Sequence, residues 1–203
     1  MDHIEKELEA GRAVILPTET VYGIFAKALD QEAVDYIYEL KRRPRDKALN
    51  LNVADEKVIR FYSKNQPGYL SKLIDSFLPG PLTIILQAND KVPDWIHSGL
   101  DTVGFRIPAH PKTLELIRKF GPLVGPSANL SGHASGTKYQ DIISEFDQVV
   151  PGVEDDDFLT RQDSTILDIS GSKARILRQC SITKADLLAQ VPELSFEEDE
   201  LPQ

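Results

Sequence analysis

Residues 33–53 read AVDYIYELKRRPRDKALNLNV, and the predicted fold depends on this stretch. Apolar residues from Ala33 to Leu40 recur at the spacing of one helical face. Over residues 49–53, Leu and Val alternate with Asn, which is the period of a strand with one polar face. Pro44 lies between the two patterns, disfavours helix for the residue before it and stiffens the turn. The stretch therefore predicts a helix, a rigid turn and a strand.

The turn itself, residues 41–47, holds five cations and one carboxylate in a chain whose formal net charge is -9. Gathering like charges costs self-repulsion, and a stiff basic turn is suited to clamping phosphate. The alternative is a solvated helix end, where the helix dipole favours cations. Both interpretations stay open on this stretch alone.

Length and composition indicate one globular unit. The chain has 203 residues, of which 41% are hydrophobic, enough for a real core. It has no apolar run of the roughly 18–20 residues that a membrane span needs, and its N-terminus lacks a signal-peptide pattern. A single cysteine, Cys180, and four scattered histidines predict neither a disulfide framework nor a bound structural metal. We expect a soluble, cytoplasmic protein without a membrane partner.

The negative charge is concentrated in two runs. Residues 154–157 supply four carboxylates and residues 193–200 supply five, and the remaining 23 carboxylates equal the 23 Lys and Arg. The body of the chain is therefore neutral overall and contains a concentrated basic turn, so the acidic balance does not exclude an anionic ligand. We predict one catalytic domain over residues 1–192 and an acidic, disordered tail over 193–203.

Helical and strand patterns alternate through most of the chain, without an internal repeat or a long linker. Residues 13–16 are a continuous apolar run closed by Pro17, which is typical of a strand buried on both faces. Residues 18–27 are expected to form the loop that leads from this strand to the next helix. The predicted fold class is α/β, of mixed α+β character. We expect a single domain with a twisted mixed β-sheet flanked by helices and a basic central groove.

Two further stretches carry polar residues after or within predicted strands. Residues 17–23 (PTETVYG) follow the buried strand, and ligands in open α/β sheets commonly lie beyond such strand ends, although an ordinary hydroxyl-rich turn is the alternative. In residues 102–108 (TVGFRIP), Arg106 interrupts an apolar run. A half-buried guanidinium needs an anionic partner. That partner is either internal, such as Asp101 or Glu19, or a bound carboxylate or phosphate.

Residues 127–136 (SANLSGHASG) form a loop of small residues after a short predicted strand. Backbone N–H groups in such loops can cradle phosphate. The chain contains neither a Walker motif nor a GxGxxG fingerprint, so this loop alone is weak support for a nucleotide site.

Several short motifs occur together in this chain: PTETVYG at 17–23, KRRPRDK at 41–47, PGPLT at 79–83, RIPAHP at 106–111, SANLSG at 127–132, ST at 164–165 and LR at 177–178. In this order, and over about residues 4–188, they strongly resemble the YrdC-like family, which contains the threonylcarbamoyl-AMP synthases. The chain looks like the short, single-domain bacterial form. It departs from the family pattern at Asn52, where longer relatives have His, and at Cys180, where Gly is usual.

The resemblance implies an L-threonylcarbamoyladenylate synthase, a nucleotidyltransferase with ATP, L-threonine and bicarbonate or CO2 as substrates. Its products are threonylcarbamoyl-AMP and pyrophosphate. Mg²⁺ is expected to accompany ATP, and no protein-bound metal is expected. The product would pass to a tRNA threonylcarbamoyl transferase complex for synthesis of threonylcarbamoyladenosine, with tRNA as a further candidate partner.

The resemblance also assigns roles to individual residues. It implies Lys41 and Arg43 as catalytic residues. It implies that threonine contacts Thr20, Arg106, Gly125 and Ser164. It implies that ATP contacts Arg43, Lys47, Thr102, Ser127, Asn129, Ser135 and Arg178. Nucleotidyl transfer needs placement of the reactants and neutralisation of phosphate charge more than covalent work, which agrees with these residue types.

Two other functions fit parts of the sequence. One is an RNA-binding module without chemistry of its own, which would use the basic groove on tRNA or double-stranded RNA. The small-residue loops and neutral body favour a mononucleotide over a duplex. The other is a carbamoyl-adenylate step in hydrogenase maturation, but those relatives carry Cys-rich zinc modules and this chain has one cysteine.

Overall fold

The computed structural model describes residues 2–147 and 149–197. In these residues the strands are β1 (Val14–Leu16), β2 (Gly23–Lys27), β3 (Leu51–Asn52), β4 (Ser63–Lys64), β5 (Leu82–Ala88), β6 (Thr102–Arg106), β7 (Leu123–Val124), β8 (Thr165–Asp168) and β9 (Arg175–Arg178). The helices are α1 (His3–Glu9), α2 (Gln31–Lys41), α3 (Glu56–Tyr62), α4 (Leu70–Phe77), α5 (Asp94–His97), α6 (Pro111–Phe120), α7 (Tyr139–Glu145) and α8 (Lys184–Gln190).

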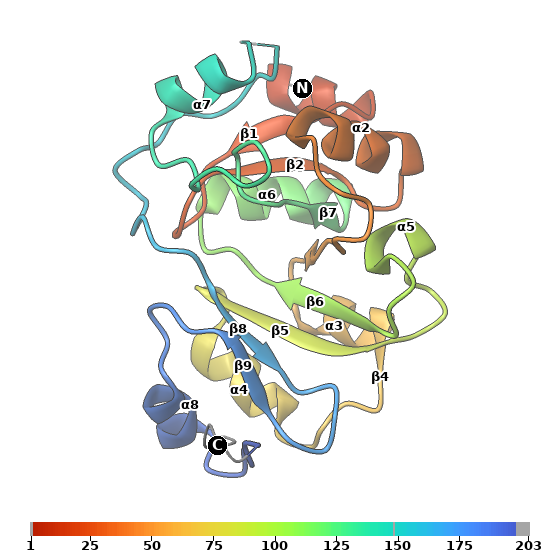
Figure 1. Ribbon diagram of the computed structural model, residues 1–203, viewed down its shortest axis with the longest axis vertical. Helices are drawn as coiled ribbons and strands as arrows, with labels where there is room; N and C mark the ends of the chain where they lie inside the picture. The colour runs from red at the N-terminus through yellow and green to blue at the C-terminus, as the bar shows by residue number, and fades with distance from the viewer. Residues whose placement is uncertain (1, 148, 198–203) are drawn as a thin grey trace.

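The described strands form one mixed sheet in the order β1-β2-β7-β3-β6-β5-β8-β9, with β4 paired to β5. β3 runs parallel to β6 and β5 parallel to β8, and the other pairs are antiparallel. Helices α1, α2 and α7 lie at one end of the molecule and α4 and α8 at the other (Figure 1). The predicted α/β fold with a mixed, helix-flanked sheet is confirmed.

Strand β1 is buried on both faces, as its apolar run predicts. Val14 and Leu16 pack into a small cluster with residues of α1 and α6. Ile15, which points to the opposite face, belongs to the main core that also holds residues of α2. The short strand is therefore covered by helices on both sides, and the loop that follows it begins at a fixed place.

The predicted helix, turn and strand of residues 33–53 are present. Asp30 caps α2 by accepting a hydrogen bond from the N–H of Ala33 at 3.2 Å. The helix ends at Lys41, and the C-cap residue Arg42 has a left-handed φ of 50°. Strand β3 is shorter than the alternation indicates and covers only Leu51–Asn52. The basic turn therefore leads directly from α2 to the sheet.

Two segments differ from the sequence interpretation. Residues 23–27 were expected to lie in a loop, but they form the buried strand β2, which pairs with β1 and β7. The sequence GIFAK carries no alternation, because both faces of this strand are covered. Residues 193–197 were expected to begin a disordered tail, but Leu194 is buried, and Ser195 and Glu197 pair with the backbone of Ala174. Residues 198–203 of that tail lie outside the described residues.

Among the residues that the structure describes, no helix combines the length and apolarity that a membrane crossing requires.

Candidate functional site

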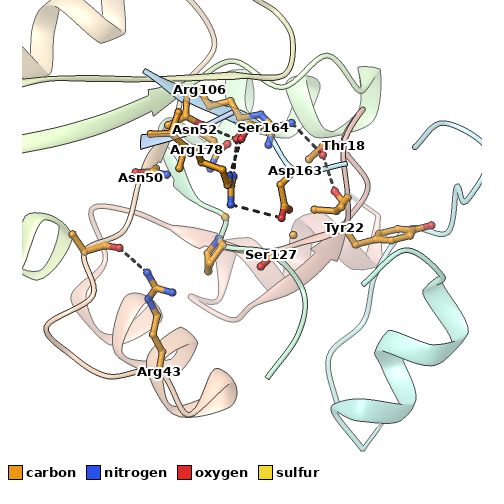
Figure 2. A pocket seen from close by; sticks show the side chains of 17 residues that line it. Thr18, Tyr22, Arg43, Asn50, Asn52, Arg106, Ser127, Asp163, Ser164 and Arg178 are labelled. Atoms are coloured by element: carbon orange, nitrogen blue, oxygen red, sulfur yellow. Dashed lines mark hydrogen bonds and ion pairs between the residues drawn. The ribbon is translucent and has the colours of Figure 1, made fainter. Parts of the chain in front are cut away.

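A cavity of about 330 Å³ lies between the β1-β2-β7 part of the sheet and the β6-β5-β8 part. Its walls come from the loop after β1, the basic turn, the ends of β3 and β6, the loop after β7 and the segment entering β8 (Figure 2). Three arginines line it, and Asp163 is the one carboxylate among its lining residues in the described chain. The cavity therefore has a net positive lining and suits an anionic ligand.

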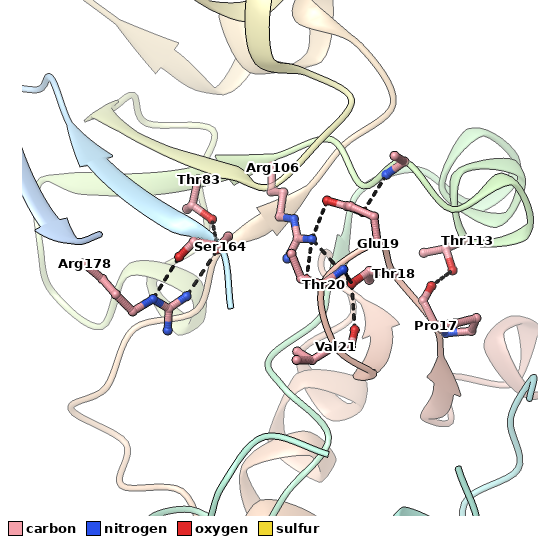
Figure 3. Close-up of polar contacts among 11 residues, drawn as sticks. Pro17, Thr18, Glu19, Thr20, Val21, Thr83, Arg106, Thr113, Ser164 and Arg178 are labelled. Carbon is pink, nitrogen blue, oxygen red and sulfur yellow. Dashed lines mark hydrogen bonds and ion pairs between the residues drawn. The ribbon is translucent and has the colours of Figure 1, made fainter. Parts of the chain in front are cut away.

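Arg106 is held at the end of β6 by the loop that follows β1. Its Nη2 donates to Glu19 Oε1 at 2.6 Å and to Thr20 Oγ1 at 2.7 Å (Figure 3). Glu19 Oε2 in turn accepts the N–H of Ala109 at 2.8 Å, so one carboxylate orients both the guanidinium and the chain after β6. Glu19, one of the two internal partners considered from the sequence, is thus confirmed as the partner of Arg106.

The guanidinium of Arg106 keeps donors that this network does not use. Its Nε is buried without a partner in the described residues. Its Nη1 makes no hydrogen bond there, and the side chain lines the cavity. Thr20 is fully buried beneath it and contributes through the hydrogen bond to Nη2 rather than as a lining residue.

A second polar group surrounds the start of β8. The hydroxyl of Ser164 lies 3.0 Å from Thr83 Oγ1, and Arg178 of β9 donates from Nε to the Ser164 carbonyl at 2.9 Å. Asp163 accepts from Ser135 Oγ at 3.0 Å and lies 3.7 Å from Arg178 Nη1. Ser135 therefore fixes Asp163, and Asp163 and Ser164 together fix Arg178 at the edge of the cavity.

The basic turn sends only one of its cations into the cavity. Arg43 lines it from the side opposite Arg106 and Arg178 (Figure 2). It donates from Nη2 to the Ala48 carbonyl at 2.8 Å and from Nε to the Lys47 carbonyl at 3.2 Å. Arg45 instead pairs with Asp35 and stacks on Tyr38, and the side chain of Lys47 is exposed. The turn is thus rigid around Arg43.

Lys41 lies beneath the loop after β7 and not in the cavity lining. Only 2% of it is exposed, and its Nζ donates to the carbonyls of Ser127 and Asn129. Burial, with the charge of Arg43 as the second cause, lowers the pKa of Lys41 to about 8.

The loop after β7 presents Gly125, Pro126 and Ser127 to the cavity. Glycine is required at 125, because a Cβ there would lie 2.4 Å from Phe25 and 2.8 Å from Asn52 Nδ2. Asn129 faces inward: its Nδ2 donates to the carbonyls of Leu130 and His133. This side chain therefore shapes the loop.

The residues singled out from the sequence fall into three groups: residues that line the cavity, residues bonded to these, which include Lys47 through its carbonyl, and Thr102, which is neither. Those that line the cavity are Arg43, Arg106, Gly125, Ser127, Ser164 and Arg178. Thr20, Lys41, Asn129 and Ser135 bond to residues of this group or to their immediate neighbours. Thr102 is not brought to the cavity, because it begins β6 and Arg106 ends it, about 13 Å along the strand.

The sequence analysis assigned no role to six polar lining residues: Thr18, Tyr22, Asn50, Asn52, Thr83 and Asp163. The alternation in residues 49–53 indicated a polar face that begins just after the cations, and Asn50 and Asn52 are that face. Thr83 stands in the PGPLT motif without an assigned role. Asp163 carries no sequence signal, because its place depends on the path of the loop before β8.

Within the described residues, no three His, Cys, Asp or Glu side chains gather into a group that could hold a metal ion.

The fold and the cavity together define a class of protein, an α/β domain whose open mixed sheet carries a cation-rich ligand site. The family model Sua5_yciO_yrdC, described as Telomere recombination, matches residues 6–180. The chain belongs to this family.

Two relatives named threonylcarbamoyl-AMP synthase illustrate the similarity. The protein from Pyrococcus abyssi (strain GE5 / Orsay) is 41% identical over 140 residues, which are 68% of this chain and 41% of the relative. The protein from Bacillus subtilis (strain 168) is 37% identical over 187 residues, which are 91% of this chain and 54% of the relative. The chain thus spans about half the length of these relatives.

Among solved structures, the crystal structure of P. abyssi Sua5 complexed with L-threonine is similar to this chain with a TM-score of 0.84. It is 32% identical, and the match covers 95% of this chain and 57% of that chain.

Proposed function

We propose that this chain is an L-threonylcarbamoyladenylate synthase. The reaction joins L-threonine, bicarbonate or CO2, and ATP into threonylcarbamoyl-AMP and releases pyrophosphate. The observation that carries the proposal is the convergence of Arg43, Arg106 and Arg178 on one cavity that also presents Ser127, Ser164 and Thr83. The names of the relatives and the threonine complex of P. abyssi Sua5 support the same assignment.

The threonine end of the cavity is proposed around Arg106. Because Glu19 and Thr20 occupy its Nη2, this cavity-lining guanidinium keeps Nη1 as a donor that would suit a carboxylate. Ser164 supplies a hydroxyl, and Gly125 leaves room where any side chain would clash with Phe25 and Asn52. These residues would hold an amino acid by its carboxylate and leave its amine free to react.

The nucleotide end is proposed on the opposite side. Arg43, Ser127 and Arg178 would contact ATP directly, while Asn129 and Ser135 keep the loop and Asp163 in place. Lys47 is exposed at the rim, where a flexible cation suits the outer phosphates. Thr102 would reach ATP only after a rearrangement of the chain before β6, so it is the weakest of the sequence assignments.

The chemistry needs little more than these groups. A carbamate oxygen of the substrate attacks the α-phosphate of ATP, and pyrophosphate leaves with the electron pair of the bond that breaks. Arg43 and Arg178 would neutralise charge on the phosphates, and Arg106 would fix the amino acid for in-line attack. Mg²⁺ bound to the triphosphate would add neutralising charge. Asp163, the lining carboxylate, is already bonded to Ser135, which fits a metal carried by ATP better than a resident one.

We extend the proposal to the partners. The product would pass to a tRNA threonylcarbamoyl transferase complex, with tRNA as a candidate ligand of the same face, in the cytoplasm. A purely RNA-binding role is less well supported, because a cavity of about 330 Å³ suits small ligands and not a duplex.

The test is amino-acid selectivity of pyrophosphate release. The protein is incubated with ATP, Mg²⁺ and bicarbonate, and with threonine, serine, valine or no amino acid. We expect release that depends on threonine and is at least tenfold slower with serine or valine. Release that is independent of the amino acid, or no release with any of them, would contradict the proposal.

A further inference from the structure

Lys41 ends α2 and is among the largest fully buried side chains of the described residues. Its Nζ donates to the carbonyl oxygens of Ser127 and Asn129, and its own carbonyl accepts the N–H of Ser131 at 2.8 Å. One residue therefore holds the loop after β7 by three hydrogen bonds. No atom of Lys41 belongs to the lining of the cavity.

Other bonds close the same loop into a compact unit. The carboxamide of Asn129 donates to the carbonyls of Leu130 and His133 at 2.8 and 3.0 Å. Glu145 of α7 accepts from the N–H of Leu130 at 3.1 Å and lies 2.7 Å from His133 Nδ1. Lys41 and Glu145 thus both fix the loop, which presents Ser127 to the cavity.

We propose that Lys41 is a positioning residue that acts on the nucleotide through the Ser127–Asn129 carbonyls and does not contact the phosphates. This inference rests on the proposed function, because it concerns the nucleotide end of that site. Two of the three ammonium protons are bound to the carbonyls of Ser127 and Asn129, and Lys41 is absent from the cavity lining. Reaching a phosphate would break both bonds and leave two buried carbonyls unpaired, which is costly.

The charged groups around Lys41 agree with this role. Burial is the largest cause that lowers the pKa of Lys41. Arg43 on the basic turn lowers this pKa further, and Glu145 on α7 raises it. With a pKa of about 8, the ammonium becomes a neutral amine at moderately alkaline pH, and its two remaining N–H donors bond the carbonyls of Ser127 and Asn129 more weakly. An arginine at the same position would stay charged.

The first test is amide hydrogen exchange in the ligand-free protein, which does not depend on the proposed function. Lys41→Met is expected to lower protection of the amides in residues 128–133 at least tenfold and to leave β5 and β6 unchanged. Arg45→Met is the matched control, since it removes one charge from the same turn without touching the loop. Unchanged protection over 128–133 in Lys41→Met would overturn the proposal.

If Lys41→Met does not fold, the pH dependence of hydrogen exchange in the wild type tests the proposal instead. Protection factors over 128–133, corrected for intrinsic exchange, should fall at least tenfold between pH 7 and 9.5 in the wild type and stay constant in Lys41→Arg. A fall of equal size in both proteins, or in neither, would overturn the proposal.

The second test separates positioning from direct phosphate contact. Calorimetry with AMP, ADP and ATP should show the same fold-loss of affinity, about tenfold, for all three in Lys41→Met, and partial recovery in Lys41→Arg. A loss that grows from AMP to ATP would show a direct contact with the phosphates. If the wild type binds none of these nucleotides, the proposed function fails, and hydrogen exchange alone decides the role of Lys41.

Discussion

The guanidinium of Arg106 and the carboxylate of Glu19 form an ion pair of 2.6 Å in which the side chains are only 13% and 12% exposed. The pair joins the end of β6 to the loop after β1, and Glu19 also accepts the N–H of Ala109. Two segments 87 residues apart in the chain are therefore fixed against each other at the proposed threonine end of the cavity.

Removing Glu19 tests the structural side of this pair. Glu19→Ala should lower the free energy of unfolding by about 3 kcal/mol, because it leaves a nearly buried guanidinium without its charge partner. Urea denaturation measures the change. Glu115→Ala, on the exposed face of α6, is the control and should leave the midpoint unchanged. Equal midpoints for wild type and Glu19→Ala would contradict the structural role.

Replacing Arg106 tests its binding role. Arg106→Met should weaken threonine at least 100-fold and ATP less than threefold, because only the threonine end depends on this guanidinium. Calorimetry with threonine and with ATP measures the two changes in affinity. The variant also leaves Glu19 unpaired, so the double variant Arg106→Met/Glu19→Gln should regain stability without regaining threonine affinity. Equal losses for threonine and ATP would make Arg106 a purely structural residue.

Arg43 is predicted to increase the rate of the reaction at saturating ATP. Arg43→Ala should lower the rate about 10²-fold at saturating ATP, as when one charge-stabilising donor is lost from a preorganised site. Arg43→Lys should also be poor, because a single ammonium cannot hold the carbonyls of Lys47 and Ala48 and face the cavity as well. Arg45→Ala, whose side chain pairs with Asp35, is the control. Near wild-type pyrophosphate release by Arg43→Ala would remove this residue from the mechanism.

Acid sensitivity should arise partly at Asp168. Burial alone would raise the pKa of this carboxyl, but hydrogen bonds from Ser170 and from Arg175 lower it below its ordinary value of 3.8. The group therefore contributes stability that is present above about pH 3.8 and is lost as pH falls through the folded-state pKa. The difference in urea midpoint between wild type and Asp168→Asn should be large at pH 6–7 and shrink toward pH 3. A difference independent of pH would exclude this contribution.

The C-terminal segment should contribute to folding. Leu194 is 5% exposed, and Leu194→Ala is expected to cost about 2–3 kcal/mol of unfolding free energy. Glu193→Ala is the neighbouring control, since its ion pair with Lys72 is half exposed. A Leu194→Ala protein as stable as the Glu193→Ala protein would mean that the segment is not packed in solution.

Local patterns in the sequence predicted the helices and strands that have one apolar face or that are bounded by Pro or Gly. Helix α2 and the turn after it follow from the apolar spacing and Pro44. Strand β2 was missed, because a strand covered on both faces shows no alternation and follows a hydroxyl-rich loop. Leu194 was missed for a related reason, since a single apolar residue within an acidic run gives no period.

The site could be predicted in its residue types but not in its contacts. Asp101 and Glu19 were equal candidates for the partner of Arg106, and topology decides between them. Asp101 precedes β6 at the end away from Arg106, whereas Glu19 follows β1 and meets the other end. The same topology places Thr102 at the end of β6 that lies away from the cavity. Lys41 was predicted from a motif, and only the packing beneath the loop shows which atoms it contacts.

We propose that this cavity joins threonine, a one-carbon unit and AMP. The most direct test of this proposal is a reaction with [¹³C]bicarbonate, threonine, ATP and Mg²⁺, followed by mass spectrometry and pyrophosphate measurement. We predict a product that contains threonine, AMP and one labelled carbon, equimolar with pyrophosphate and absent when threonine is omitted. Pyrophosphate release without a labelled adenylate, or no release at all, would contradict the claim.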